Sequence, residues 1–366
     1  MNVVFDYQIF ANQKVGGISR YCIELVKHLI KLDVEPEIVA PLYIGSYLSE
    51  IDKSRIYGFK NPSFLKDRHI RNFINKYFFE RYCRKTRPDI VHRTYYREHS
   101  RLANSKTKYV LTVHDMIEEL HLEKTKKVKI LIDKKRKAIS ASDHIICVSE
   151  NTKKDLLNIY DIDPANVSTI HLGVAEVFTK VKNLKSPVSK PFILNVGQRG
   201  AYKNFDFLVD IYASEKVINQ NFDLVTFGGR DFKLDERQRF RDLGIMEKIH
   251  WFGGNDLILR DLYNSASAFV FPSLYEGFGL PPIEAMRCDC PVICSNGGSI
   301  PEIVGDAGAY FDPKDPNSLK IALYDVLFNG DSKQLLIEKG RNRSNQLSWG
   351  KCAQETANVY RKLCES

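Results

Sequence analysis

The chain has 366 residues, more than one ordinary hydrophobic core accommodates, which favours two domains. Hydrophobic residues make up 43% of it and charged residues 27%, as in soluble globular proteins, and no run of about 18 apolar residues indicates a membrane span. The opening segment MNVVFDYQIF is typical of an apolar strand and lacks the charged region and apolar core of a secretory signal, so we expect a cytoplasmic protein.

The first half of the chain alternates short apolar strands with amphipathic segments. The segment 18–32 carries apolar residues along one helical stripe. Because helices separate the strands, the pattern predicts a parallel sheet covered on both faces. The expected strands are residues 3–10, 35–42, 89–93, 108–115 and 144–149.

Two basic stretches, residues 66–87 and 123–140, stand out within the formal net charge of +9. Both are predicted to form amphipathic helices with basic faces. Three interpretations compete: a solvated helix face, contact with an anionic membrane surface, and nucleic acid. A solvated helix face is the default interpretation. Aromatic residues between the cations place a phospholipid interface second, ahead of nucleic acid, for which no recognised motif is present.

A polar segment with two prolines, residues 180–191, is typical of a linker, and the alternating pattern restarts after it. We therefore predict two doubly wound α/β domains, the first over residues 1–180 and completed by 350–366, the second over 181–349. The strands expected in the second domain are residues 191–197, 222–229, 248–254, 268–273 and 291–295.

The most informative loop follows the predicted strand 268–273 and leads into a helix. Ligands of such sheets bind beyond the carboxyl ends of the strands. Gly277 and Gly279 let backbone amides approach a ligand, and the following helix N-terminus suits a phosphate. Glu276 and Glu284 bracket the loop. Taken alone, Glu284 in the first helical turn complements the helix dipole equally well, and Glu276 is equally a surface residue.

The segment SLYEGFGLPPIEAM, followed by CPVICSNGGSIPEIVGDAGAYFDP (290–313), resembles the retaining glycosyltransferases of family 4, which have the GT-B fold. The resemblance implies two Rossmann-like domains facing across a cleft, with the closing helix 349–363 packing back on the first. It also implies that Glu276 contacts the donor sugar and Glu284 the ribose. The backbone that would hold the sugar and diphosphate belongs to Gly277, Phe278, Gly279 and Leu280.

A second loop, NVGQRGAYKNF (195–205), places two cations after a strand, where a diphosphate would lie. Arg199 and Lys203 are the predicted catalytic cations, with an exposed loop position as the alternative. Many relatives carry the arginine directly after the strand-end glycine, where this chain has Gln198, so the prediction for Arg199 is weaker. By analogy only, Asn255 borders the nucleobase.

The first domain contributes three further loops by the same resemblance. Gly16 and Gly17 match a glycine loop near the donor diphosphate. His114, at a strand end, matches a histidine placed against the donor sugar. In VHRTYYREH, the resemblance points to the acceptor side, although buried aromatic packing is nearly as well supported. The acceptor residues predicted there are His92, Tyr95 and Tyr96.

The resemblance is strongest to mannosyltransferases of bacterial surface-polysaccharide pathways. We expect a hexose, mannose from GDP-mannose, to pass to a lipid-linked oligosaccharide on the inner face of the cytoplasmic membrane, without cofactor or metal. UDP-sugars and dTDP-rhamnose are alternative donors. The alternative classes of protein are a phosphorylase, an epimerase and a non-catalytic sugar-nucleotide binder of the same fold. The cluster Cys288, Cys290 and Cys294 favours core packing over a metal site.

Overall fold

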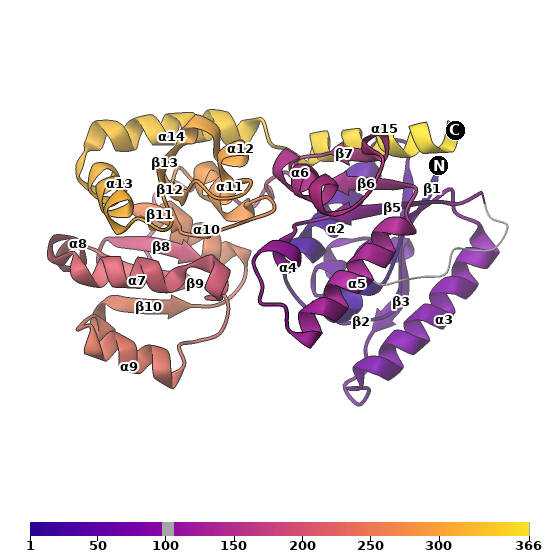
Figure 1. The fold of residues 1–366 in the computed structure, drawn as a ribbon, viewed down its shortest axis with the longest axis horizontal. Coiled ribbons are helices and arrows are strands. Elements are labelled where there is room, and N and C mark those ends of the chain that lie inside the picture. The colour runs from indigo at the N-terminus through magenta and orange to yellow at the C-terminus, as the bar shows by residue number, and fades with distance from the viewer. Residues whose placement is uncertain (97–105, 366) are drawn as a thin grey trace. The chain divides into compact units, whose positions relative to one another are not determined.

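The computed structural model describes residues 1–96 and 106–365 and divides into two compact units (Figure 1). Unit 1 comprises Met1–Gly173 and Trp349–Ser366, and unit 2 comprises Val174–Ser348. The domain boundary predicted from the sequence, after residue 180, lies slightly later in the chain than the boundary between these two units. Each unit contains one sheet with helices packed against it, so the predicted α/β class with two doubly wound domains is confirmed.

The sheet of unit 1 is parallel throughout, with strand order β3-β2-β1-β4-β5-β6-β7. The interior strands are Val- and Ile-rich and almost fully buried, as a sheet covered on both faces requires. The strands are β1 (Asn2–Phe5), β2 (Glu35–Tyr43), β3 (Ile56–Lys60), β4 (Ile90–Arg93), β5 (Lys108–Val113), β6 (His144–Cys147) and β7 (Val167–Thr169).

The helices of unit 1 include both predicted basic stretches. Asp67 caps the first of these helices, α3, and Thr125 caps the second, α5, each through a side-chain oxygen that accepts backbone N–H groups. The closing helix α15 packs on α2 in the same unit, with the Tyr21 and Trp349 rings 6.1 Å apart. The helices are α1 (Gln8–Asn12), α2 (Gly17–Leu29), α3 (Arg68–Thr86), α4 (Ile117–Leu120), α5 (Lys126–Ser140), α6 (Glu150–Ile159) and α15 (Trp349–Glu365).

The sheet of unit 2 is also parallel, with strand order β10-β9-β8-β11-β12-β13. Its strands are β8 (Phe192–Val196), β9 (Asp223–Phe227), β10 (Ile249–Phe252), β11 (Ala268–Phe271), β12 (Val292–Ser295) and β13 (Gly308–Phe311). Its helices are α7 (Phe205–Ser214), α8 (Lys216–Asn221), α9 (Leu234–Asp242), α10 (Asp256–Ser265), α11 (Leu280–Arg287), α12 (Ile300–Val304), α13 (Pro316–Phe328) and α14 (Gly330–Asn345).

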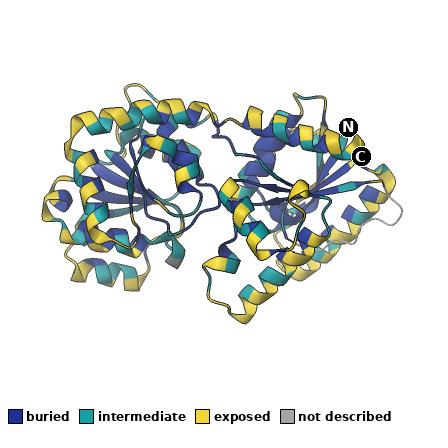
Figure 2. Cartoon of the chain, turned by 45° about the horizontal axis from the view of Figure 1, so that its top comes forward, coloured by how far each residue is buried: buried dark blue, intermediate teal, exposed yellow. Residues whose placement is uncertain are grey.

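Buried residues follow the strands and the inner faces of the helices in both units (Figure 2). Cys288, Cys290 and Cys294 belong to this interior as free thiols, and burial raises the pKa of each. Over residues 1–96 and 106–365 there is no group of three or more His, Cys, Asp and Glu side chains arranged to hold a metal ion. In the same ranges, no helix combines the length and apolar character of a membrane span.

Candidate active site

The loop between β11 and α11 forms the centre of the candidate site in unit 2. β11 is a buried apolar strand, and Gly279 ends the loop with φ of +103°, a conformation that favours glycine. Two prolines then stand in the first turn of α11. Glu276 and the residues Gly277–Gly279 are buried, so the chain holds this loop in one conformation at the carboxyl edge of the sheet.

Lys203 and Glu276 meet as an ion pair, which the sequence did not reveal. The Lys203 Nζ lies 2.6 Å from the Glu276 Oε1, and the two side chains are only 21% and 11% exposed. The Leu274 N–H donates to the Tyr202 carbonyl at 2.8 Å, which joins the same two loops through the backbone. The structure therefore brings together the cation and the carboxylate that were predicted separately.

The turn that precedes α12 packs against the Glu276 loop and is hydrogen-bonded to it. The Ser299 Oγ lies 2.9 Å from the Glu276 carbonyl oxygen and 3.0 Å from that of Phe278. A Cβ on Gly297 would lie 2.3 Å from the Leu274 carbonyl oxygen, and one on Gly298 would lie 2.8 Å from that of Glu276. The Gly-Gly-Ser pattern before a proline-initiated helix indicates a helix N-terminus that could face the sugar, but it does not reveal these contacts with the Glu276 loop.

Arg199 lies apart from this pair, against α9. Its Nε donates to the Glu236 Oε1 at 2.6 Å and its Nη2 to the Arg230 carbonyl at 2.6 Å. Its guanidinium also lies 5.0 Å from the centre of the Phe232 ring. Desolvation raises the pKa of Glu236, but the hydrogen bonds from Arg199 and from the Lys233 backbone N–H, together with the charges of both residues, outweigh it and leave the pKa below its ordinary value. The structure thus gives Arg199 a tertiary pairing that the sequence did not predict.

Glu284 and Asn255 lie on neighbouring helices. Glu284 is in the second turn of α11 and not in the first, because the helix already begins at Leu280. Its Oε2 accepts a hydrogen bond from the buried Tyr263 hydroxyl at 3.2 Å. Asn255 caps α10 by accepting the Ile258 N–H at 3.2 Å. Both side chains thus have structural partners in addition to any contact with a nucleotide.

In unit 1, His114 follows β5 and lies at the carboxyl edge of the sheet. Its backbone N–H donates to the Tyr96 hydroxyl at 3.1 Å, and its ring packs edge-on against Tyr21, 5.1 Å between centroids. Desolvation, with the charges of His92 and Lys135, lowers the pKa of His114 to about 3. The ring is therefore neutral at physiological pH and able to exchange hydrogen bonds without carrying charge.

Gly16 is the N-cap of α2 and Gly17 its first residue, at the same edge of the sheet. Gly16 has an extended backbone with φ of 163°, and the Gln13 side-chain oxygen accepts the Ser19 N–H at 3.1 Å. A Cβ at Gly16 would lie 2.3 Å from the Gln13 amide nitrogen. Gln13 therefore occupies part of the helix N-terminus at which the sequence predicts contact with the donor diphosphate.

His92 is a core residue, in agreement with the buried alternative and against the acceptor-side prediction. It is 1% exposed, its Nδ1 is hydrogen-bonded to the Tyr360 hydroxyl, and its Nε2 lies 2.8 Å from the Thr112 Oγ1. Burial lowers its pKa to about 3. Tyr96 is also buried, whereas Tyr95 is partly exposed, so of this predicted trio Tyr95 is the most accessible to an acceptor.

A buried lysine that the sequence analysis missed stabilises the His114 loop. The Lys135 Nζ, with the side chain only 1% exposed, donates to the Asp115 carbonyl at 2.7 Å and pairs with Glu118 at 3.3 Å and Glu119 at 3.0 Å. Desolvation lowers the pKa of Lys135, but the three acidic residues outweigh it and raise the pKa. A lysine in a strongly basic helix gave no sequence signal for burial.

Comparison with known proteins assigns both halves of the chain. Residues 15–176 match Glycosyltransferase Family 4 and residues 176–343 match Glycosyl transferases group 1. The chain is 25% identical to O-antigen chain mannosyltransferase B of Escherichia coli over 97% of this chain and 99% of that relative. It is 28% identical to the O-antigen chain mannosyltransferase RfbU of Salmonella typhimurium over 52% of each chain. The serotype-specific mannosyltransferase WbdA of Escherichia coli is 28% identical over 72% of this chain but only 34% of its own length.

Solved structures share the fold at lower identity. Sucrose-phosphate synthase from Thermosynechococcus elongatus superposes with a TM-score of 0.77 at 20% identity, covering 99% of this chain and 98% of that one. WaaG, a glycosyltransferase involved in lipopolysaccharide biosynthesis, gives 0.76 at 15% identity, covering 98% and 99%. Anabaena HepE in complex with UDP and glucose gives 0.75 at 15% identity, covering 99% and 100%.

Two doubly wound parallel sheets of this plan give the chain the GT-B fold, which it shares with these solved structures. The chain belongs to the glycosyltransferases, with a family 4 domain followed by a group 1 domain.

Proposed function

We propose that the protein transfers mannose from GDP-mannose, with retention of configuration, to a lipid-linked oligosaccharide during synthesis of a bacterial surface polysaccharide. The observation that carries this proposal is the Lys203–Glu276 pair, 2.6 Å apart beside the Gly277–Gly279 loop. The mannosyltransferase names of the relatives support the donor sugar. The O-antigen chain in the names of two relatives supports a surface-polysaccharide product. A lipid-linked acceptor and a peripheral position on the inner face of the cytoplasmic membrane belong to the same proposal.

In the proposed mechanism, Lys203 and the loop amides stabilise the nucleoside diphosphate as it departs. Fixed donors aimed at developing charge are the largest contribution in many enzymes. The acceptor hydroxyl approaches from the same face, and a phosphate oxygen of the leaving group takes its proton. Glu276 orients the sugar hydroxyls and stabilises cationic character at the anomeric carbon; a covalent role as nucleophile is the alternative. Neutral His114 exchanges hydrogen bonds with the sugar.

Metal ions are not required in this scheme, because Lys203 and the backbone amides supply the positive potential at the leaving group. Divalent ions commonly stabilise a transferring phosphate by the same electrostatic means. The predicted result is full transfer activity in excess chelator. Loss of activity in chelator, restored by a divalent ion, would show that these groups are insufficient.

A donor panel tests the proposal as a whole. Slow hydrolysis and transfer are measured with GDP-mannose, UDP-hexoses, UDP-N-acetylhexosamines and dTDP-rhamnose, and the anomeric configuration of the product is read by NMR. We expect GDP-mannose to be consumed with retention. Preference for a UDP- or dTDP-sugar would refute the donor, and inversion would refute the mechanism. Conversion without acceptor into an epimer, or reaction with free phosphate, would indicate the rival enzyme classes.

A further inference from the structure

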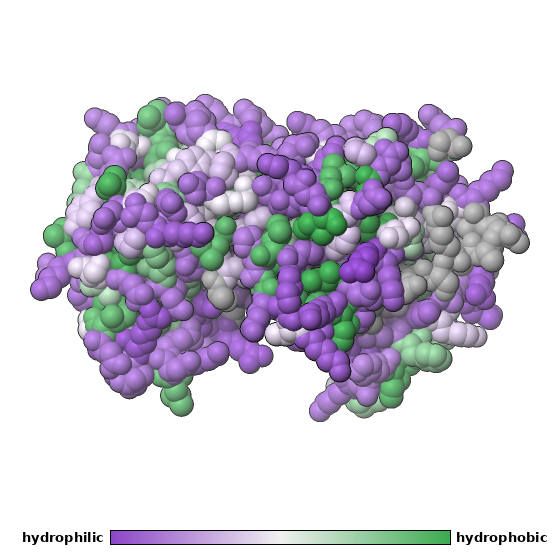
Figure 3. All heavy atoms as spheres, viewed as in Figure 1, coloured by the Kyte–Doolittle hydropathy of each residue, from purple (hydrophilic) through white to green (hydrophobic). Residues whose placement is uncertain are grey.

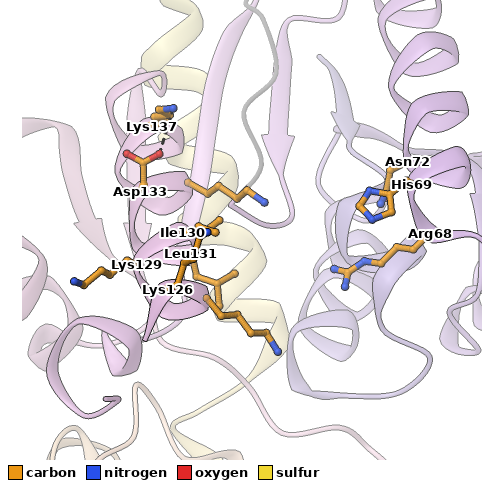
Figure 4. A pocket seen from close by; sticks show the side chains of 11 residues that line it. Arg68, His69, Asn72, Lys126, Lys129, Ile130, Leu131, Asp133 and Lys137 are labelled. Carbon is orange, nitrogen blue, oxygen red and sulfur yellow. Dashed lines mark ion pairs between the residues drawn. The ribbon is translucent and has the colours of Figure 1, made fainter. Parts of the chain in front are cut away.

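A wide basic groove lies within unit 1, between the first turns of α3 and the length of α5 (Figure 4). Its volume is about 1040 Å³. Arg68 and His69 project from α3 toward α5, which supplies the opposite wall. We call this feature the basic groove; it is lined by Arg68, His69, Asn72, Lys126, Lys127, Lys129, Ile130, Leu131, Asp133, Lys134 and Lys137.

The charges of the basic groove are unbalanced. Its lining contains six lysine or arginine side chains and one carboxylate, Asp133, which pairs with Lys137 at 3.2 Å. Arg68 donates through Nε to the neutral Asn12 side chain at 2.9 Å. Within residues 1–96 and 106–365, Lys127 and Lys134 have no ion-pair partner. The protein thus gathers cations here without neutralising them, which favours a bound anion.

Several of these cations also lie at helix N-termini, where positive charge destabilises a helix. Arg68 and His69 are the first two residues of α3, and Lys126 and Lys127 are the first two of α5. Helix N-termini carry partial positive charge and favour anions, so cations there oppose both helix dipoles. Asp67 and Thr125 already cap the first amides, which leaves the side chains as the principal ligands for an anion.

The groove opens at the edge of the sheet where the site lies. α3 follows β3, and α5 follows β5 with the short helix α4 between them, so the chain enters both helices from the carboxyl ends of parallel strands. The segment that begins at His114 reaches α5 through α4. Lys127, Ile130 and Lys134 have the spacing of one helical face. An anion bound to this face would therefore lie on the His114 side of unit 1.

Apolar side chains accompany the cations on the exposed surface. Ile130 in the groove is 46% exposed, and on α3 Ile70, Phe73 and Tyr77 are 51%, 74% and 56% exposed. These three α3 residues share one face of the helix. Apolar residues also interrupt the hydrophilic surface on the face shown in Figure 3. A ligand with an anionic head and a hydrocarbon tail matches both features better than free phosphate or nucleic acid does.

We infer that the basic groove binds the diphosphate of the lipid-linked acceptor, with its hydrocarbon chain along the exposed apolar face of α3. This inference rests on the proposed function, since it assigns the acceptor subsite of the same reaction. It gives the diphosphate charge-assisted contacts on unit 1, separate from the Lys203 site of unit 2.

The test measures direct binding of farnesyl diphosphate, farnesol and inorganic pyrophosphate, with saturating GDP present to fill the donor site. Two double variants are compared: Lys127→Gln with Lys134→Gln in the groove, and Lys85→Gln with Lys154→Gln as a control of equal charge on exposed positions of α3 and α6. We expect farnesyl diphosphate to bind about tenfold more weakly to the groove variant, corresponding to loss of ~1.4 kcal/mol, and normally to the control.

The remaining outcomes each overturn the inference. Equal affinity for pyrophosphate and farnesyl diphosphate would show that the groove binds free phosphate groups and does not recognise the hydrocarbon chain. Groove-dependent binding to phosphatidylglycerol vesicles alone would show that it contacts the membrane surface. Groove-dependent binding to RNA alone would show that it is a nucleic-acid site. Equal losses in both variants would indicate a diffuse charge effect. Hydrolysis of GDP-mannose without acceptor tests the proposed function independently of the groove. If the unaltered protein does not hydrolyse GDP-mannose, the proposed donor is wrong, whichever ligand the groove binds.

Discussion

Glu276 is held at the centre of the candidate site by Lys203 and by the turn at Ser299. Glu276→Gln keeps the shape and a hydrogen-bonding group but removes the negative charge. We expect donor affinity to remain nearly unchanged and the transfer rate to fall by on the order of 10²–10³, as for other groups that stabilise developing charge. Donor binding by calorimetry and kcat for transfer distinguish the two effects. Normal turnover in this variant would exclude the electrostatic role.

Arg199 is predicted to contribute to stability more than to the reaction rate in the conformation described. Its guanidinium is bonded to Glu236 and the Arg230 carbonyl. Arg199→Gln and Glu236→Gln should each lower the free energy of unfolding of unit 2 by about 1–3 kcal/mol, because each leaves a charged partner without its hydrogen bond. Urea unfolding and kcat are measured for both. A large loss of kcat in Arg199→Gln alone would instead indicate direct contact with the diphosphate.

At the residue scale, the sequence could predict which side chains follow which strands but not what they contact. Glu276 and Lys203 were both expected beside the donor, and their ion pair joins residues 73 positions apart. His92 has the strand-end position expected of a site residue, yet its ring points into the core, because neither composition nor spacing reveals side-chain direction near a strand terminus.

Close contact between the α12 turn and the Glu276 loop makes a prediction about an element. Gly298 and Gly244 both have positive φ, +56° and +68°. An added Cβ at Gly298 would lie 2.8 Å from the Glu276 carbonyl oxygen, while one at Gly244 would meet nothing within 4 Å. Both alanine variants should lose about 1–2 kcal/mol of stability from backbone strain. Only Gly298→Ala should also lower kcat, because Glu276 must move.

The two substitutions form a matched pair, so their difference isolates the contact. Thermal unfolding and kcat are measured for each. Equal kcat values in Gly298→Ala and Gly244→Ala would mean that the turn does not position Glu276.

The α4–α5 corner depends on Lys135. Lys135→Met removes the cation that faces Glu118 and Glu119, whose side chains are only 18% and 4% exposed, and leaves these largely desolvated carboxylates without the cation that pairs with them. We expect a loss of about 3–5 kcal/mol in the free energy of unfolding. Lys137→Met breaks an exposed pair with Asp133 and should cost at most ~1 kcal/mol. Chemical denaturation of both variants measures these losses in the free energy of unfolding. Similar small losses in the two variants would show that the cluster around Lys135 contributes little to stability.

At the scale of elements, strand prediction succeeded where apolar runs are long and missed three of the four edge strands; only β10 was predicted among them. β3 is largely exposed, β7 has three residues and β13 is only partly buried, so none presents a continuous apolar run. The expected strand over residues 3–10 ends at Phe5, and α1 begins at Gln8. The apolar residues of α1 are buried like those of a strand, and a run this short does not distinguish the two.

The whole molecule combines two units whose sheets follow the same doubly wound plan, and periodicity alone could predict this repetition. The return of α15 to unit 1 could not be deduced from periodicity, because an amphipathic helix does not specify which sheet it covers. That knowledge came from resemblance to a family. Its physical basis in this chain includes the Tyr360 hydroxyl, which is hydrogen-bonded to His92 inside unit 1.

Acid should destabilise unit 1 through three histidines whose rings are desolvated. Among the described residues, burial lowers the pKa of His92 and His114 to about 3 and that of His144 to about 4, and all three lie in unit 1. The ordinary value is 6.5. Because the unfolded chain binds protons more readily, the contribution to stability is complete above pH 6.5 and is lost as the pH falls towards 3–4.

For His92 alone, lowering the pH from 7 to 5 should cost about 2 kcal/mol. Amide hydrogen exchange, expressed as protection factors at each pH, separates the units: β4 and β5 should lose protection over this interval before β9 and β11 do. His92→Gln changes stability at every pH by removing the bonds to Thr112 and Tyr360, so the informative quantity is its slope with pH. We expect a shallower slope in His92→Gln and an unaltered one in His69→Gln, whose ring is exposed on α3. Parallel slopes in all three proteins would place the acid sensitivity in carboxylates instead.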